Sequence, residues 1–221
     1  MAKDKKKEAK QRIFDAAVSL FARKGYAAVG IREIAKVADV NICMINYYYG
    51  GKVGILREII NECNEKYYRA VTNVDIKDVP PEHYVRSMIQ NLIKFYRKNA
   101  EIAMVACNIV PFDVPEILDL KAKWVIEYRE RLNKFYKQLG FDTYDVVQMS
   151  FIRGVLTTIV QAHFTHRYFY ENIMQTAAKS KYLQEHVLPE ATLKYDDPYY
   201  DRYTAMLTNF YLYGLNGIIP K

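Results

Sequence analysis

Residues 47–52 place three consecutive tyrosines, two glycines and a lysine next to one another. Phenol hydroxyls can donate hydrogen bonds to phosphate oxygens, and an ammonium group attracts the same anions. Backbone N–H groups at the start of a helix also favour anions. The stretch therefore predicts phosphate contacts by Tyr47, Tyr48 and Lys52. The alternative, that these rings simply pack in a core, is what we expect for Tyr49, and it stays open for the other two tyrosines.

A short helix over residues 42–49 would present these side chains. Asn41 is a good N-cap residue, because its side chain can accept a hydrogen bond from the first turn. Ile45 and Tyr49 lie four residues apart, on one face, and should join Val40 in the core. Two glycines then end the helix, and Lys52 opens a longer one.

Two earlier helices precede this one. Apolar residues at positions 13, 16, 17, 20 and 21 form a helical stripe that ends at Lys24-Gly25. A second apolar stripe, at positions 31, 34, 35 and 38, follows Gly30, which is an acceptable N-cap. Asp39-Val40 forms the turn to residues 42–49. This order is typical of a helix-turn-helix, whose second helix enters the major groove of DNA.

The charge distribution favours a polyanionic partner. Residues 1–52 contain 11 lysines and arginines against 5 acidic residues, whereas residues 53–221 contain 21 against 20. An excess confined to one end of a chain is typical of binding to nucleic acid or to an anionic membrane. A solvated basic tail at residues 3–10 is the alternative.

Residues 12–60 resemble the DNA-binding domain of the tetracycline-repressor (TetR) family. The order Ile-x-x-Ala-Ala-x-x-Leu-Phe, Lys-Gly-Tyr, Arg-Glu-Ile-Ala, a turn, and an aromatic cluster followed by lysine recurs without gaps. The resemblance implies an all-α homodimer, with DNA-binding residues 1–51 and a ligand-binding and dimerisation domain at 52–221. It implies a repressor that binds a palindromic operator and that leaves the DNA when a small effector binds. The expected DNA contacts are Arg32, Asn41, Ile42, Cys43, Met44, Asn46, Tyr47, Tyr48 and Lys52.

The sequence departs from the family pattern in the residues that would contact bases. Ile42, Cys43 and Met44 stand where the family usually has a lysine, glycine or small polar residue and a hydroxyl residue, and these three cannot make bidentate base contacts. Base recognition would then depend on Arg32, on Asn46, which can pair with adenine, and on apolar contacts with thymine methyl groups.

Three further departures concern the backbone. Asp39 replaces the usual turn glycine, and aspartate tolerates the left-handed conformation at some strain. Gly51 and Gly54 replace better helix formers, so we expect a soft start to the fourth helix. If that helix is the lever between the domains, Gly54→Ala should stiffen it.

Residues 53–221 show further helical patterns. One of them, over 143–167, is apolar on nearly every side, which predicts its own core on one face and a partner chain on another. The expected dimer interface is Val147, Val155, Ile159, Tyr203, Met206, Phe210 and Tyr213. The predicted helices are 81–99, 101–108, 115–139, 143–167, 177–188 and 199–214.

Aromatic and sulfur-containing residues of the central helices could line an apolar pocket for a lipophilic or aromatic effector. The alternative is that they are ordinary core. His163 and His166 lie one turn apart, but no carboxylate or thiolate is close in sequence, so we expect no metal site and no cofactor. No catalytic motif occurs, so we expect no enzyme. The candidate ligand residues are Tyr96, Met104, Cys107, Phe112, Trp124, Tyr128, Phe151 and Thr158.

Three widely spaced cysteines without a Cys-x-x-Cys motif indicate a reducing, cytoplasmic setting. Residues 203–220 are uncharged, yet they contain threonines, asparagines and glycines, so we predict a buried helix and no membrane partner. Two other functions stay open. The C-terminal bundle could be a carrier or an enzyme that the helix-turn-helix only tethers, or the protein could be a dimeric regulator that binds no ligand.

Overall fold

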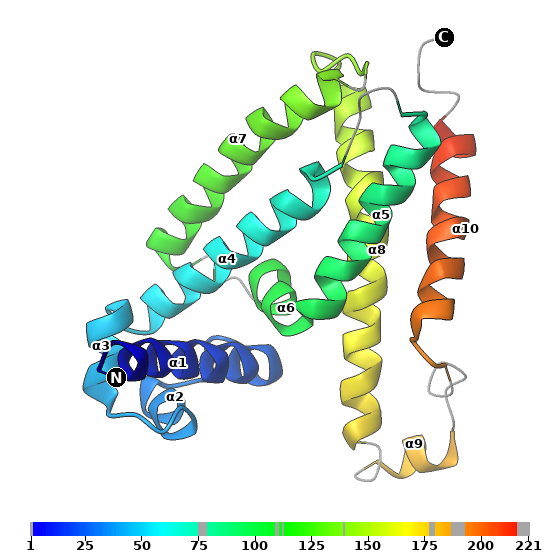
Figure 1. Ribbon diagram of the computed structural model, residues 1–221. Helices are drawn as coiled ribbons and strands as arrows, with labels where there is room; N and C mark the ends of the chain where they lie inside the picture. Colours follow the sequence, from blue (N-terminus) through cyan, green and yellow to red (C-terminus); the bar gives the residue numbers. More distant parts are fainter. Residues whose placement is uncertain are drawn as a thin grey trace. The chain divides into compact units, whose positions relative to one another are not determined.

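The computed structural model describes residues 2–74, 79–108, 111, 113–138, 140–176, 180–186 and 193–215. These residues form an all-α fold without strands, as predicted (Figure 1). Among them, every helix is too short or too polar to span a lipid bilayer. The helices are α1 (Ala2–Lys24), α2 (Ile31–Val37), α3 (Ile42–Tyr49), α4 (Lys52–Thr72), α5 (Pro81–Lys98), α6 (Ala100–Asn108), α7 (Pro115–Gln138), α8 (Val146–Thr176), α9 (Lys181–Glu185) and α10 (Asp197–Leu215).

Most predicted helix ends are confirmed to within a residue or two, because glycine and proline mark them. Gly25 follows α1 with a φ of 80°, and prolines open α5 and α7. α8 differs, since it starts three residues later than predicted and runs on to Thr176. Its start is set by Asp145, whose carboxylate accepts a 2.9 Å hydrogen bond from the backbone N–H of Gln148. Of the helix predicted over 177–188, the described part is α9.

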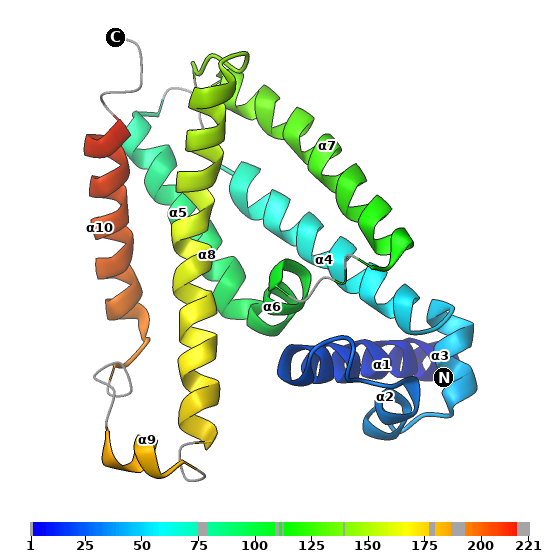
Figure 2. The same ribbon diagram turned by 180° about the vertical axis from the view of Figure 1, so that it is seen from behind.

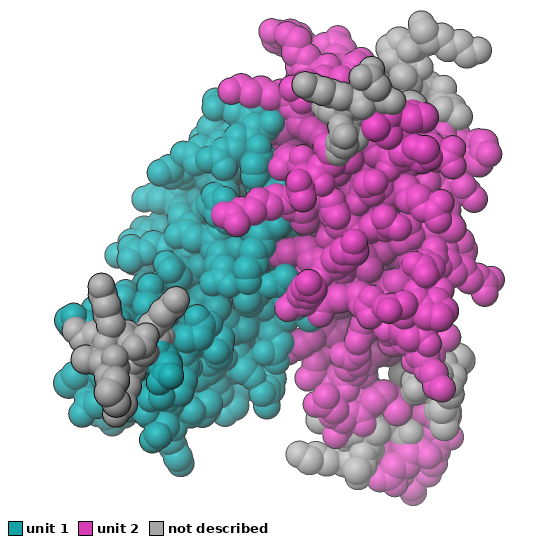
Figure 3. Space-filling view, viewed as in Figure 1, with its two compact units in different colours: residues 1–68, 99–131 teal, residues 69–98, 132–221 magenta. Residues whose placement is uncertain are grey.

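The chain forms two compact units (Figure 3). Unit 1 comprises residues 1–68 and 99–131, and unit 2 comprises residues 69–98 and 132–221. Each unit therefore combines segments that are far apart in the sequence. The domain boundary after residue 51 stays a prediction.

In unit 1, α1 packs against α2, α3 and α6. The core is mainly aliphatic at its centre, because the apolar stripes of α1, α2 and α3 and the first turns of α4 all face inward. Its fully buried side chains include Ile13, Phe21, Ile34, Ile45, Ile55, Leu56, Ile59 and Ile60.

In unit 2, α5 packs against both α8 and α10, which lie beside it in both ribbon views (Figures 1 and 2). Aromatic rings fill much of this core: Phe164 stacks on Tyr96 and on Tyr200, with ring centroids 5.3 and 5.6 Å apart. Tyr211 is fully buried, and its hydroxyl donates a 2.8 Å hydrogen bond to the carbonyl oxygen of Val155. This bond ties α10 to α8.

Candidate nucleic-acid interface

Both ends of α3 are capped, and the predicted N-cap, Asn41, is confirmed. The Asn41 side-chain oxygen accepts a 2.8 Å hydrogen bond from the backbone N–H of Cys43. At the other end, Gly50 adopts the left-handed conformation with a φ of 71°, and its N–H donates to the carbonyl oxygen of Asn46 at 2.9 Å. These two caps fix the length and the direction of the helix that would enter DNA.

One face of α3 is held by the protein interior. Ile45 and Tyr49 are buried, as predicted, whereas Val40 is only half-buried. The Tyr49 hydroxyl donates a 2.8 Å hydrogen bond to the carbonyl oxygen of Lys10 on α1. Burial, and then the nearby charge of Glu58, raise the pKa of Tyr49, so the phenol keeps its proton and remains a donor.

The turn between α2 and α3 has a brace that the sequence analysis missed. Asp39 has a φ of 50°, so the left-handed conformation expected at this position is confirmed. The Arg12 guanidinium of α1 donates to the carbonyl oxygens of Ala38 at 2.9 Å and of Asp39 at 3.3 Å. Arg12 therefore binds carbonyl oxygens of the turn that follows α2. The helical pattern of the first helix indicated only that Arg12 is exposed, and it gave no sign of this contact.

The opposite face of α3 is open. Tyr47 is 70% exposed, and its ring meets the edge of Tyr48 at a centroid distance of 5.0 Å. All nine predicted DNA contacts belong to unit 1: Arg32 lies on α2, Asn41 is the N-cap of α3, Lys52 is the first residue of α4, and the other six lie on α3. Arg32, Asn41, Cys43, Asn46 and Tyr47 are exposed, while Ile42, Met44, Tyr48 and Lys52 are half-buried.

Lys52 opens α4 directly after Gly51, whose φ is 112°. Its ammonium nitrogen lies 4.1 Å from the centroid of the Tyr26 ring, a cation–π distance. Partial burial lowers the pKa of Lys52, and burial together with Asp113 and Glu116 raises the pKa of Tyr26. Tyr26 thus fixes the position of the lysine. Tyr26 is the tyrosine of the Lys-Gly-Tyr motif, but the motif did not predict its contact with Lys52.

Gly54 corrects our expectation for the start of α4. A Cβ atom at this position would lie 1.6 Å from the carbonyl oxygen of Tyr49 and 2.7 Å from its carbonyl carbon. The prediction that Gly54→Ala stiffens the helix is therefore wrong, because the methyl group has no room beside the end of α3. Glycine is required here for close backbone approach, and it lets α4 start against α3.

The predicted ligand residues are distributed over both units. In unit 1, the Trp124 ring nitrogen donates a 2.9 Å hydrogen bond to Asn61, and Tyr128 lies 5.9 Å from the rings of Tyr67 and Tyr68. In the same unit, Met104 is half-buried and Cys107 is exposed. In unit 2, Tyr96 is buried, whereas Phe151 and Thr158 are exposed. Phe112 lies outside the described residues, and the common pocket stays a prediction.

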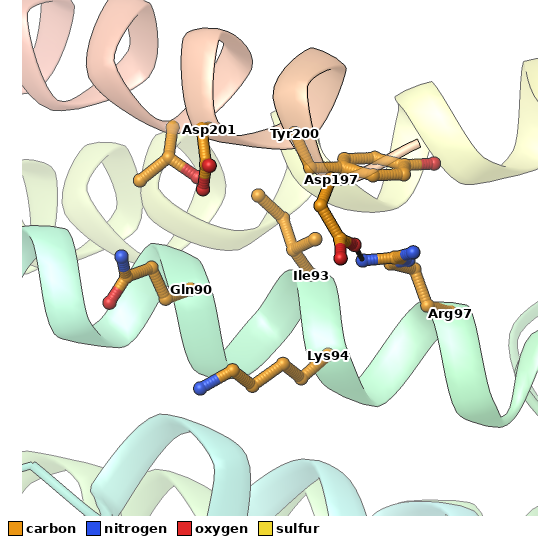
Figure 4. Close-up of a pocket in the computed structure, with 8 residues that line it drawn as sticks. Gln90, Ile93, Lys94, Arg97, Asp197, Tyr200 and Asp201 are labelled. Atoms are coloured by element: carbon orange, nitrogen blue, oxygen red, sulfur yellow. Dashed lines mark hydrogen bonds and ion pairs between the residues drawn. The ribbon is translucent and has the colours of Figure 1, made fainter. Parts of the chain in front are cut away.

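Unit 2 contains a groove of about 400 Å³ between α5 and α10 (Figure 4). Arg97 of α5 forms a 2.7 Å ion pair with Asp197 of α10, and its guanidinium lies 4.8 Å from the centroid of the Tyr200 ring. The groove is mostly polar, unlike the apolar pocket we expected. Its lining residues, which include none of the predicted ligand residues, are Gln90, Ile93, Lys94, Arg97, Asp197, Tyr200, Asp201 and Thr204.

Large apolar side chains are exposed on α8 and α10. Val147 is 80% exposed, Phe210 is 56% exposed and Tyr213 is 78% exposed, and Met206 is also exposed. The other predicted interface residues, Val155, Ile159 and Tyr203, are half-buried. His163 packs among aromatic rings. Within the described parts of the chain, no three metal-binding side chains gather in one place.

The family described as "Bacterial regulatory proteins, tetR family" matches residues 13–59. A curated relative, the probable HTH-type transcriptional regulator YttP of Bacillus subtilis, is 25% identical over 120 residues. That match covers 53% of this chain and 58% of the relative. The chain therefore spans little more than half the length of this relative.

Solved structures share the fold over nearly the whole chain. The fatty acid degradation regulator FadR from Bacillus halodurans is 16% identical, with a TM-score of 0.59, over 91% of this chain and 93% of that one. FadR from Bacillus subtilis, solved in complex with stearoyl-CoA, is 15% identical, with a TM-score of 0.57, over 90% of this chain and 96% of that one. At such identities the likeness establishes the fold alone.

Proposed function

We propose that this chain is a DNA-binding transcriptional regulator, because residues 13–59 match the tetR family of bacterial regulatory proteins. It acts in the cytoplasm as a homodimer, binds a palindromic operator and is released by a small effector, which makes it a repressor. The observation that carries the proposal is α3, a helix capped at both ends, with one face buried and the other exposed.

The DNA contacts divide into two kinds. Tyr47, Tyr48 and Lys52 bind phosphates, because phenols and an ammonium group flank the exposed face of α3 and the start of α4 adds free N–H groups. Arg32 and Asn46 contact base edges, because both side chains are exposed and can make bidentate hydrogen bonds.

The remaining predicted contacts complete the face. Ile42, Cys43 and Met44 lie on the first turn of α3, where they would meet thymine methyl groups in the major groove. Asn41 contributes to DNA binding by capping α3, because its side-chain oxygen already accepts the hydrogen bond from the Cys43 N–H. The operator would then be read by few hydrogen bonds and several apolar contacts.

A homodimer explains the exposed apolar residues of α8 and α10. Large exposed apolar side chains are typical of an interaction site, and a twofold axis would bring the same two helices of a second copy against them. Two copies of α3 would then lie one turn of DNA apart, or a near multiple, which makes the operator a palindrome.

The effector that we propose is lipophilic or aromatic. Tyr96, Met104, Trp124 and Tyr128 are apolar or aromatic and lie on the central helices, which supports an apolar molecule over a cationic one. The complex of Bacillus subtilis FadR with stearoyl-CoA is consistent with an acyl chain as one such molecule. Release requires that the effector bind the DNA-incompetent state more tightly than the competent one.

The proposal is tested by DNA binding at several salt concentrations. Footprinting upstream of the gene itself defines a fragment, and fluorescence anisotropy then gives the affinity. Lys52→Ala should weaken binding to all sequences alike and lower the slope of log affinity against log salt by about 1, because one phosphate contact is lost.

The matched control is Lys134→Ala, which removes the same charge from an exposed position of α7 in unit 2. Its salt slope should equal that of the wild type. If Lys52→Ala also keeps the wild-type slope, the phosphate assignment is wrong. If the wild-type protein binds no promoter fragment at low salt, the proposed function itself is wrong.

A further inference from the structure

The groove between α5 and α10 in unit 2 is lined by two matching stripes of side chains (Figure 4). On each helix the lining residues recur at i, i+3, i+4 and i+7, which is the spacing of one helical face. The groove therefore follows the seam along which the two helices pack. Its volume of about 400 Å³ is in the range of small-molecule sites. The lining positions are 90, 93, 94 and 97 on α5, and 197, 200, 201 and 204 on α10.

At one end of the groove, the charges are already paired. Arg97 forms the 2.7 Å ion pair with Asp197, and its guanidinium lies over the Tyr200 ring. That ring also stacks on Phe164, and its hydroxyl accepts a 2.8 Å hydrogen bond from the Arg167 guanidinium. Because the charges of Arg97 and Asp197 cancel, the remaining residues decide which charges a ligand needs.

Those remaining residues include one charge of each sign. Lys94 lies on α5 and Asp201 lies on α10, and both side chains are exposed (Figure 4). Within the described part of the chain, neither of them forms an ion pair, with the other or with a further residue. A purely anionic ligand would be repelled by Asp201, and a purely cationic one by Lys94. A molecule that carries both charges can pair with both side chains.

A buried hydroxyl also lines the groove. Thr204 is only 3% exposed, and it lies one turn after Asp201 on α10. Its carbonyl oxygen accepts a 2.7 Å hydrogen bond from the Thr208 hydroxyl. Among the described residues, however, no group bonds to the hydroxyl of Thr204 itself. Because a buried polar group without a partner costs stability, this hydroxyl favours a polar ligand in the groove.

We propose that this groove binds a small zwitterion of the amino acid class, either a free amino acid or a dipeptide. The ammonium group of the ligand pairs with Asp201 and donates a hydrogen bond to the Thr204 hydroxyl, and its carboxylate pairs with Lys94. The buried Ile93 packs against a small apolar side chain of the ligand. This site is additional to the apolar effector pocket, because its lining contains none of the residues predicted for that pocket.

The ligand class is tested by isothermal titration calorimetry on the full chain. L-valine and L-alanyl-L-alanine are titrated at millimolar concentrations, and at least one of them should bind. The tighter of the two gives the length of the ligand. N-acetyl-L-alanyl-L-alanine has no ammonium group, and L-alanyl-L-alanine amide has no carboxylate. Each should bind about tenfold more weakly than L-alanyl-L-alanine, because one ion pair is lost.

The position of the site is tested by NMR of isoleucine methyl groups. The Ile93 methyl signal, identified by its loss in Ile93→Val, should shift as the zwitterion is added. The methyl signals of Ile34 and Ile45, which are fully buried in unit 1, should not shift.

Three variants test the roles of the polar residues. Asp201→Asn should weaken binding of the zwitterion about tenfold, whereas Asp119→Asn, at an exposed position of unit 1, should leave it unchanged. In Lys94→Gln, the ligand carboxylate has lost its partner, so L-alanyl-L-alanine and its amide should bind alike.

Thr204→Val removes only the hydroxyl and should weaken binding about fivefold. Urea denaturation should show no loss of stability in this variant, since the hydroxyl has no partner to lose within the described protein. A purely structural threonine would give the opposite result, with reduced stability and unchanged binding.

Several results would overturn the proposal. These are no heat and no shift of the Ile93 signal with either zwitterion, equally tight binding of a blocked analogue, or wild-type affinity in Asp201→Asn. None of these measurements involves DNA. The zwitterion site can therefore fail while the proposed regulator function holds, and the reverse is equally possible.

Discussion

α3 and α10 expose opposite kinds of surface. On α3, the aliphatic Ile45 and the ring of Tyr49 are buried inside unit 1, and the exposed positions are amide, thiol and phenol groups. On α10, in unit 2, Tyr211 is buried, but Phe210 and Tyr213 beside it are exposed.

This difference indicates two kinds of partner. A helix that has already buried its apolar face gains most from a polar or charged partner, and DNA offers phosphates and base edges. A helix that leaves apolar rings exposed gains by burying them, at about 25 cal/mol per Å² of apolar surface. In the proposed homodimer, a second copy of the same chain would provide such a surface. The following tests would break or sharpen this contrast.

The largest effect is expected from two helical glycines, one in each unit. Gly54→Ala places a methyl group on the carbonyl oxygen of Tyr49, so we expect a loss of about 3 kcal/mol in the free energy of unfolding. Gly154→Ala, on α8, meets no atom within 4 Å and should gain about 0.5–1 kcal/mol, because alanine favours a helix.

Urea denaturation of both glycine variants measures this difference. Equal stabilities would mean that α4 does not approach the end of α3 so closely. A Gly54→Ala protein that folds well but fails to bind DNA would instead indicate that α3 has moved.

The next effect concerns the exposed face of α10. Met206→Glu would place a charge in the proposed dimer interface, and an unpaired carboxylate there should weaken association about 100-fold, or roughly 3 kcal/mol. Light scattering after gel filtration should show the mass change from two chains to one. DNA affinity should fall with it, since a single half-site remains.

The control for the interface is Tyr144→Glu, which adds the same charge at an exposed loop position of unit 2. It should leave the mass unchanged. A Met206→Glu protein that still has twice the chain mass would exclude this part of α10 from the interface.

A smaller effect is expected from His163, on α8. Its ring centroid lies 4.6 Å from that of Tyr203, and burial, with the charges of Arg167 and His166, lowers its pKa from 6.5 to about 4. Between pH 4 and pH 6.5, the unfolded chain therefore binds a proton at His163 that the native state does not bind. Stability should fall as the pH drops from about 6.5 to about 4, by about 1–2 kcal/mol once solvent screening is allowed for.

Unfolding free energies at several pH values test this expectation. His163→Phe keeps a ring among the tyrosines and should lose most of the pH dependence in that window. His166→Gln, at an exposed position, should keep it. Identical pH profiles for the wild type and His163→Phe would contradict the assignment.

The smallest effects should separate neighbouring tyrosines. Tyr49→Phe removes the hydroxyl that binds the carbonyl oxygen of Lys10, so stability should fall by about 1 kcal/mol. Tyr47→Phe removes an exposed hydroxyl, so stability should stay the same while DNA affinity falls by about 1 kcal/mol. Urea denaturation and fluorescence anisotropy measure these two effects. The reverse result would mean that the roles of Tyr47 and Tyr49 are exchanged.

Much of the DNA-binding region could be predicted because its signals are local. The bounds of α3, the Asn41 cap, the left-handed Asp39 and the buried Tyr49 all depend on residues within one or two turns of each other. The start of α8 was predicted three residues too early, because the capping role of Asp145 was missed in a stretch of apolar residues.

The sequence by itself determined an all-α chain with a helix-turn-helix near its start, because helical periodicity and capping are short-range. Only the tertiary structure placed Lys52 over Tyr26 and Arg12 against the turn. It also showed that Gly54 has no room for a side chain. Such contacts join helices to turns elsewhere in the chain. They follow from how the helices pack, and no pattern along a single helix encodes that packing.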